Sequence, residues 1–196
     1  MKLGLIYLAS GFSRRFGGNK LLASFQGAPL FTYGLKHLQE AAAQLTPQVA
    51  CTVRVITQYE EIIQYCKECD IDVCFNGQAQ EGMAASIRLG VRQGKDQDGW
   101  AFFAADQPFL DSQTIASFLQ DFKDSGKTLG TVTTGMRQGS PAVFLSMHRE
   151  ELLALQGDIG GRNILRRYQE KVYRFSVPDA KLIDIDTTDT LQKHNF

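Results

Sequence analysis

The residues best suited to chemistry lie in a glycine- and arginine-rich stretch near the N-terminus, from Ala9 to Lys20. Small residues allow a backbone to approach a triphosphate closely and to present its N–H groups. Hydroxyl, guanidinium and ammonium groups add hydrogen bonds and positive charge; here they belong to Ser13, Arg14, Arg15 and Lys20. The stretch therefore predicts a polyphosphate-binding loop, and the simpler alternative is a flexible basic turn.

Two acidic segments farther along the chain could hold a metal ion. Asp106 is followed by Gln-Pro and comes directly after the apolar run at 100–105. A carboxylate there can bind magnesium that bridges triphosphate oxygens, or it can simply cap a turn. Near the C-terminus, Asp-Ile-Asp-Thr at 184–187 offers Asp186 as a second magnesium ligand. These residues could instead cap the following helix, the role that the preference of threonine for helix starts favours for Thr187.

The charge distribution supports an anion site near the N-terminus. Lys plus Arg and Asp plus Glu both total 21, so the chain has no global basic excess for nucleic acid. The segment before Glu40 nevertheless contains basic residues and no acidic residue. The loop at 9–20 contains neither the Gly-Lys-Ser/Thr of a Walker A motif nor a Gly-x-Gly-x-x-Gly dinucleotide motif. A loop that binds a triphosphate there would therefore differ from both of these known phosphate-binding loops.

The segments that would carry these residues alternate between strand-like and helix-like patterns. Apolar and β-branched runs predict strands covered on both faces; they lie at 2–8, 52–57, 72–75, 100–105 and 128–134. Helical apolar spacing, with Pro29 and Asp111 at two of the starts, predicts helices; these lie at 29–45, 59–69, 82–93, from 111 through 122, and at 188–194.

This alternation predicts one α/β domain over residues 1–196, with three layers and a mainly parallel sheet. Ligands of such sheets bind beyond the carboxyl ends of the strands. We therefore expect the loop at 9–20 and Asp106 to share one rim. Gly-Ser-Pro at 139–141 and Gly-Asp-Ile-Gly-Gly-Arg at 157–162 interrupt the alternation and are expected to be loops over that rim.

The remaining features favour a cytoplasmic protein without membrane contact. The apolar runs are far shorter than the roughly 20 residues that cross a bilayer, and the N-terminal segment lacks a secretory cleavage pattern. Cys66 and Cys69 form a Cys-x-x-Cys, but no second pair or nearby histidine completes a zinc set. We expect all four cysteines to be reduced structural thiols.

Taken in order, these motifs resemble those of the MobA-like nucleotidyltransferases, over nearly the whole chain. The ordered set comprises the loop at 9–20, Gly-Met-Ala-Ala-Ser-Ile-Arg at 82–88, Asp-Gln-Pro at 106–108, Gly-Ser-Pro at 139–141, the stretch at 157–162 and Asp-Ile-Asp-Thr at 184–187. Within the family, the chain is most similar to the molybdenum cofactor cytidylyltransferases. The resemblance implies a Rossmann-like fold that transfers CMP from CTP to the terminal phosphate of molybdopterin, with Mg²⁺ as cofactor.

The resemblance also distributes roles among the residues. Nucleotide binding is expected of Leu8, Ala9, Ser10, Gly11, Ser13, Arg14, Arg15, Lys20, Gly82 and Ser86. Binding of the pterin substrate is expected of Gly157, Asp158, Gly160, Gly161 and Arg162. Arg15, Lys20 and Asp106 are the expected catalytic residues, and Asp106 and Asp186 the expected magnesium ligands.

Several alternatives stay open on the sequence. The family commonly has Ala-Ala-Gly or Ala-Gly-Gly after the first strand, whereas this chain has Ala-Ser-Gly at 9–11. Because this stretch is expected to face the base, GTP stays open beside CTP. A sugar phosphate would be a different acceptor. A non-catalytic carrier that delivers the cofactor to a molybdenum hydroxylase is the alternative outside enzymes, and pyrophosphate release from CTP would separate the two classes.

Overall fold

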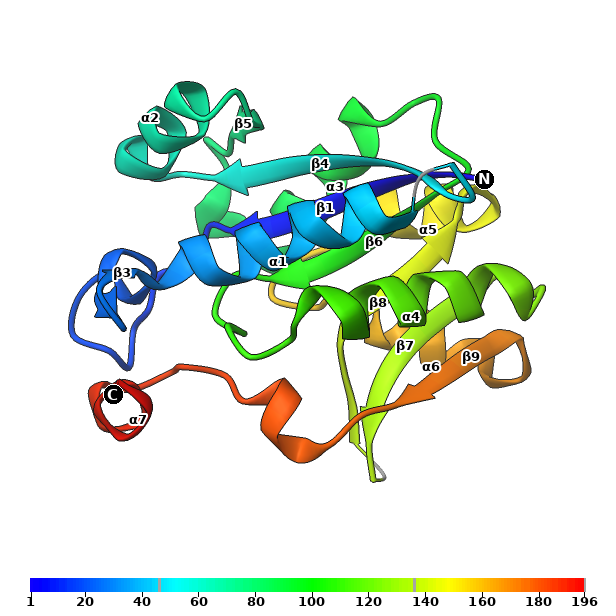
Figure 1. Cartoon of the computed structure of the whole chain (residues 1–196). Helices are drawn as coiled ribbons and strands as arrows, with labels where there is room; N and C mark the ends of the chain where they lie inside the picture. Colours follow the sequence, from blue (N-terminus) through cyan, green and yellow to red (C-terminus); the bar gives the residue numbers. More distant parts are fainter. Residues whose placement is uncertain (46, 136, 196) are drawn as a thin grey trace.

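The computed structural model describes residues 1–45, 47–135 and 137–195. Within these residues, seven strands form one sheet in the order β5-β4-β1-β6-β8-β7-β9 (Figure 1). Their bounds are β1 (Lys2–Ala9), β4 (Ala50–Thr57), β5 (Asp72–Phe75), β6 (Gly99–Ala104), β7 (Leu129–Thr134), β8 (Arg137–Leu145) and β9 (Val172–Ser176). Strand β8 is antiparallel to its neighbours β6 and β7, and the other neighbouring pairs are parallel. The predicted mainly parallel α/β sheet is confirmed.

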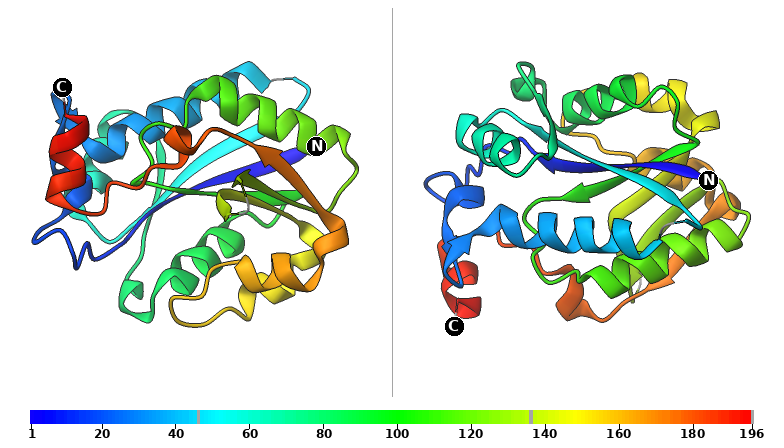
Figure 2. Two further views of the ribbon diagram at one scale, coloured as in Figure 1. Left: turned by 90° about the horizontal axis from the view of Figure 1, so that it is seen from below. Right: turned by 45° about the horizontal axis from the view of Figure 1, so that its top comes forward.

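Helices cover both faces of this sheet (Figures 1 and 2). They are α1 (Leu30–Leu45), α2 (Glu60–Glu68), α3 (Met83–Gln93), α4 (Ser112–Asp124), α5 (Arg149–Leu153), α6 (Arg162–Arg167) and α7 (Thr188–His194). Successive side chains of a strand point to opposite faces: Leu5 and Tyr7 of β1 pack in the core with α1 and α4, and Ile6 packs in the core with α3 and α6. None of the helices in the described ranges is both long enough and apolar enough to cross a membrane.

The expected loop at 139–141 is wrong, because these residues lie inside β8. Gly-Ser-Pro resembles a turn, and proline cannot donate to a strand ladder. Here the Ser140 side chain adds hydrogen bonds to the backbone of β6. Its Oγ accepts from the Ala104 N–H at 3.2 Å and donates to the Phe102 carbonyl oxygen at 3.2 Å. At 157–162 the loop prediction holds up to Gly161, and Arg162 begins α6.

The C-terminal segment, residues 177–195, runs back along the rim of the sheet and ends beside the hairpin of β2 (Ser24–Phe25) and β3 (Ala28–Pro29) (Figure 1). Ile185 is fully buried in a small core with Phe25 and Leu30. Its backbone N–H donates to the Asp106 carbonyl oxygen at 3.0 Å. Thr187 caps α7, as expected, by accepting from the Thr190 N–H. The two acidic segments predicted from the sequence are therefore neighbours.

Candidate active site

A cavity of about 370 Å³ lies at the carboxyl end of β1, between the loop at 10–20 and the start of α3. Its lining contains the expected nucleotide-binding residues Leu8, Ser10, Gly11, Ser13, Arg14, Arg15, Lys20, Gly82 and Ser86, together with Asp106, Asp158 and Asp186. Ala9 is outside this lining. It is fully buried, and its carbonyl oxygen accepts from Thr57 Oγ1 at 2.9 Å. Ala9 thus anchors the start of the loop to β4 and does not face the cavity.

Side chains from the next strand end hold the loop in place. Gln58 Nε2 donates to the Ser10 carbonyl oxygen at 2.7 Å, and the Tyr59 hydroxyl donates to the Gly11 carbonyl oxygen at 2.5 Å. Ser13 has a positive φ of 52°, and its Oγ accepts from the Lys20 N–H at 3.2 Å. Sequence reasoning missed Gln58 and Tyr59; the only signal was their position just beyond a strand, at the rim where the ligand is expected.

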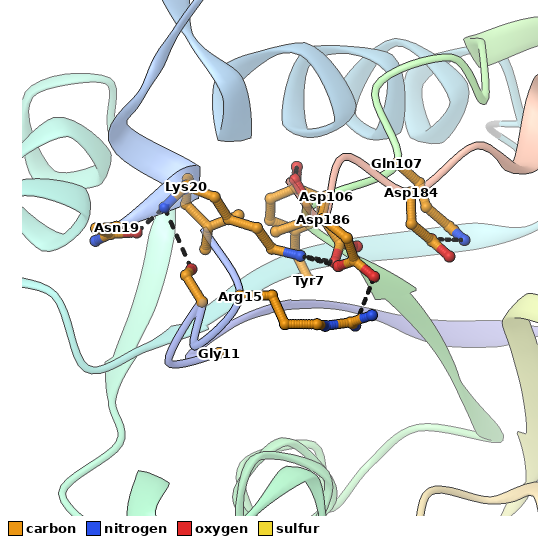
Figure 3. Close-up of polar contacts among 12 residues, drawn as sticks. Tyr7, Gly11, Arg15, Asn19, Lys20, Asp106, Gln107, Asp184 and Asp186 are labelled. Atoms are coloured by element: carbon orange, nitrogen blue, oxygen red, sulfur yellow. Dashed lines mark hydrogen bonds and ion pairs between the residues drawn. The ribbon is translucent and has the colours of Figure 1, made fainter. Parts of the chain in front are cut away.

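Lys20 is the centre of a compact ion cluster (Figure 3). Its Nζ lies 2.5 Å from Asp106 Oδ2 and 2.7 Å from Asp186 Oδ1. The Lys20 side chain is only 9% exposed. Arg15 Nη2 approaches the other oxygen of Asp186 at 2.7 Å, from a side chain that is 74% exposed. Two carboxylates, one from each predicted acidic segment, therefore converge on a single cation.

The protonation of these groups follows from burial and from their neighbours. Burial lowers the pKa of Lys20, but the paired carboxylates of Asp106 and Asp186 outweigh it and leave that pKa above its ordinary value. Burial opposes ionisation of Asp186, yet Lys20 and Arg15 hold its pKa below the ordinary value. Burial, and next the charge of Asp106, raise the pKa of Asp184. Asp186 is therefore the better anionic anchor of the two C-terminal acids.

The two carboxylates of the cluster form a donor set that fits magnesium. Across the described residues, no group of three or more His, Cys, Asp or Glu side chains could hold a metal ion. Magnesium keeps several waters and usually takes one or two carboxylates together with substrate phosphates. Asp106 and Asp186 already converge on the Lys20 ammonium, so they can share a cation. The residues present fit the expected Mg²⁺.

A second cavity of about 640 Å³ adjoins the first and shares Arg15, Asp106 and Asp186 with it. Four of the five expected substrate residues line it: Asp158, Gly160, Gly161 and Arg162. The fifth, Gly157, lines a separate groove beside Glu81 and Arg88. The sequence analysis gave no role to other residues that line this cavity, among them Gln107, Arg137, Gln138, Ser140 and Asn163; Asp184, from the acidic segment at 184–187, lines it as well. The amide of Gln107 donates to Asp184 Oδ1 at 2.8 Å.

The wall between the cavities is built where the loop at 157–161 meets α3. Asp158 Oδ1 accepts from the Met83 N–H at 3.3 Å, and the Gly157 carbonyl oxygen accepts from the Ala84 N–H at 3.0 Å. Gly82 has a φ of 87°, and a Cβ there would lie 2.5 Å from Asp158 Oδ1. Only glycine allows this approach. Asp158 therefore caps the N-terminus of α3, a structural role separate from the substrate binding expected of it.

Fold and site together define an α/β nucleotide-binding protein whose rim concentrates a basic loop and two carboxylates. The MobA-like NTP transferase domain matches residues 5–172, and the chain belongs to this family of nucleotidyltransferases. No curated protein matches the sequence.

Solved structures share the fold over nearly the whole chain. Rv0371c from Mycobacterium tuberculosis is 19% identical, with a TM-score of 0.80 over 98% of this chain and 96% of its own. The nucleotidyl transferase Mth528 from Methanothermobacter is 18% identical, with a TM-score of 0.80 over 98% and 95%. A CMP:2-keto-3-deoxy-manno-octonic acid synthetase, solved in complex with CTP, is 13% identical, with a TM-score of 0.75 over 98% and 96%.

Rv0371c has also been solved in complex with manganese. That structure is 17% identical to this chain and has a TM-score of 0.79, over 100% of this chain and 98% of its own. Divalent metal is thus compatible with this fold, and at these identities the likeness shows the fold alone.

Proposed function

We propose that this chain is a single nucleotidyltransferase domain, residues 1–196, that transfers CMP from CTP to the terminal phosphate of a molybdopterin-type cofactor and releases pyrophosphate. The observation that carries the proposal is the junction of two cavities at Arg15, Asp106 and Asp186. A reaction that joins a nucleotide to a second substrate needs two sites that meet where the bond forms. The junction also holds the cation-binding groups that such a reaction requires.

The nucleotide takes the first cavity in this proposal. Its triphosphate lies against the loop at 10–20, where Arg15 and Lys20 hold the β- and γ-phosphates and stabilise the departing pyrophosphate. Asp106 and Asp186 hold Mg²⁺, which neutralises charge on the triphosphate when bound. Lys20 leaves its carboxylate partners for the phosphates, which are also anionic. The basic side chains of the loop therefore bind the triphosphate, which carries more negative charge than the two carboxylates.

The acceptor takes the second cavity. A phosphate oxygen of the acceptor attacks the α-phosphorus of CTP; the new oxygen–phosphorus bond forms as the bond to the β-phosphate bridging oxygen breaks. A phosphate nucleophile is already anionic near neutral pH, so the site needs positioning and charge neutralisation rather than a general base. Arg137 and Arg162 line this cavity, and within the described part of the chain neither has an ion-pair partner. Both are therefore free for an anionic acceptor.

The decisive experiment offers the protein each of the four nucleoside triphosphates with Mg²⁺ and molybdenum cofactor, and follows pyrophosphate and the mass of the product. The expected result is a cytidine dinucleotide, formed with CTP and lost in Asp106→Asn. A guanosine dinucleotide would redefine the donor, and a product formed only with sugar phosphates would redefine the acceptor. Cofactor binding without pyrophosphate would identify a carrier for a molybdenum hydroxylase and overturn the enzyme.

A further inference from the structure

A buried amide lies behind the wall of the first cavity, at Asn76, which is 3% exposed and directly follows β5. Its Nδ2 donates to Ser86 Oγ at 2.9 Å and reaches Ser10 Oγ at 3.4 Å. Both serines line the cavity, and Asn76 does not. The amide is thus placed to act on a ligand through the two hydroxyls.

The sheet order puts this network at the end of the cavity away from the ion cluster. Asn76 follows β5 and Asp106 follows β6, with β4 and β1 between them (Figure 1). Neighbouring strands lie about 4.8 Å apart, so β5 and β6 are separated by about 14 Å. Ser10 itself follows β1, beside β6, but its Oγ is bonded to Ile56 of β4 and reaches Asn76 beyond β5, so the hydroxyl lies on the side of the cavity away from Asp106. A nucleotide whose triphosphate lies near Lys20 and Asp106 would therefore have its base beside Ser10 and Ser86.

The hydrogen bonds of the network fix which hydroxyl donates. Asn76 Oδ1 accepts from the Gln78 N–H at 3.1 Å, which leaves the two Nδ2 hydrogens for the serines. Ser10 Oγ donates its own hydrogen to the Ile56 carbonyl oxygen at 3.1 Å, so only a lone pair is left for the cavity. Ser86 Oγ accepts from Asn76, and no acceptor among the described residues takes its hydrogen. The cavity therefore presents one acceptor, Ser10, beside one donor, Ser86.

We propose that Asn76 is a positioning residue for base selection, which makes Ser10 the acceptor for an exocyclic amino group and Ser86 the donor to the adjacent ring nitrogen. This inference rests on the proposed function, because its ligand is the cytosine of CTP. Cytosine carries a 4-amino donor beside the N3 acceptor. Uracil carries a 4-oxo acceptor beside the N3–H donor, so in the same pose it meets both serines with the wrong group. Sites built on such hydrogen bonds reject the mismatched analogue strongly.

The test is Asn76→Asp, which keeps the size of the side chain and the oxygen that accepts from Gln78. The new carboxylate oxygen accepts where the amide donated, so Ser86 turns its hydrogen toward residue 76 and offers the base a lone pair. We expect the ratio of CTP to UTP affinity, measured by calorimetry with Mg²⁺, to fall at least tenfold. Thr57→Val is the matched control, because it removes the hydrogen bonds of the Thr57 hydroxyl with the Ala9 carbonyl oxygen and the Tyr59 N–H beneath the same loop and keeps those of both serines.

A ratio unchanged in folded Asn76→Asp, or an equal loss for CTP and UTP as in the control, overturns the proposal and leaves Asn76 a purely structural residue. If Asn76→Asp does not fold, Ser86→Ala replaces it: CTP affinity should fall while UTP affinity is kept, and an equal fall overturns the proposal. Product mass with the wild-type protein tests CMP transfer separately. A protein that transfers CMP but shows no ratio shift refutes the role of Asn76 alone.

Discussion

The two cavities that meet at Asp106 are built in opposite ways. At the proposed nucleotide end, Ser10 and Ser86 are each less than 9% exposed and hydrogen-bonded to other parts of the protein. At the acceptor end, Arg137 and Arg162 are exposed, and Ile159 is 51% exposed. Groups already ordered in the free protein lose little entropy on binding. The side of the first cavity that carries the serines is therefore preorganised, whereas Arg137 and Arg162 would become ordered only on binding an anionic ligand.

The largest effect should come from Asp106→Asn, at the point that the two cavities share. The substitution keeps the shape of the side chain but removes its charge, so the fold should persist while turnover falls by about 10²-fold or more. Asp186→Asn should show a milder defect, with more Mg²⁺ needed for half-maximal rate. Steady-state rates across a magnesium titration measure both. Wild-type turnover with an unshifted magnesium dependence in Asp106→Asn would make Asp106 a turn cap and move the metal site elsewhere.

The next largest effect should be a loss of CTP affinity, which we expect to be greater for a buried cation of the loop than for an exposed one. Lys20→Ala should cost about 1.5 to 3 kcal/mol of CTP affinity, the usual value of a charge-assisted hydrogen bond. Arg15→Ala should cost less, because the Arg15 side chain is 74% exposed and solvent screens its charge. Calorimetry of CTP binding to each folded variant gives the comparison. Equal losses would contradict the expected effect of burial, and unchanged affinity in both would remove the loop from the site.

At the acceptor end, Arg162→Ala should weaken binding of the acceptor without weakening binding of CTP. We expect the KM for the acceptor to rise about tenfold, equivalent to about 1.4 kcal/mol, while CTP affinity stays at the wild-type value. Arg137→Ala provides the parallel measurement at the other arginine that lines this cavity without an ion-pair partner among the described residues. A loss of CTP affinity in Arg162→Ala would mean that the two ends are not separate sites, and the contrast between them would fail.

The smallest effect on activity should come from the cysteines, which lie outside both cavities. Cys66 is fully buried, and burial raises the pKa of its thiol to about 11, so it stays protonated at neutral pH. Cys66→Ser combined with Cys69→Ser should lower the melting temperature, because a hydroxyl replaces a buried sulfur, and leave turnover near normal. Stoichiometric zinc in the native protein, measured by elemental analysis, would reverse this interpretation.

The sequence predicted the preorganised end better than the adaptable one. The loop at 9–20 and Asp106 could be placed because each directly follows a buried strand, and parallel strands end at one rim. Asp186 was proposed as a magnesium ligand because two acids precede a capped helix, and the structure brings its carboxylate to Lys20 beside Asp106. Asn76 and Tyr59 could not be assigned, because a single polar residue after a strand has no motif and acts only through contacts distant in sequence. Arg137 was missed because the Gly-Ser-Pro beyond it suggests a turn, whereas it begins β8.

The path of the C-terminal segment brings together members of the ion cluster that lie far apart in the sequence. Arg15 and Asp186 are ion-paired although 171 positions separate them, and 166 positions separate Asp186 from Lys20. The loop after β1 and the end of β6 therefore cannot complete this cluster until the segment that carries Asp186 has docked beside Asp106. Closing a loop of this length costs conformational entropy before its contacts can offset that cost. Docking of this segment buries Ile185 and, in the proposed function, supplies the second carboxylate for Mg²⁺ in the same step.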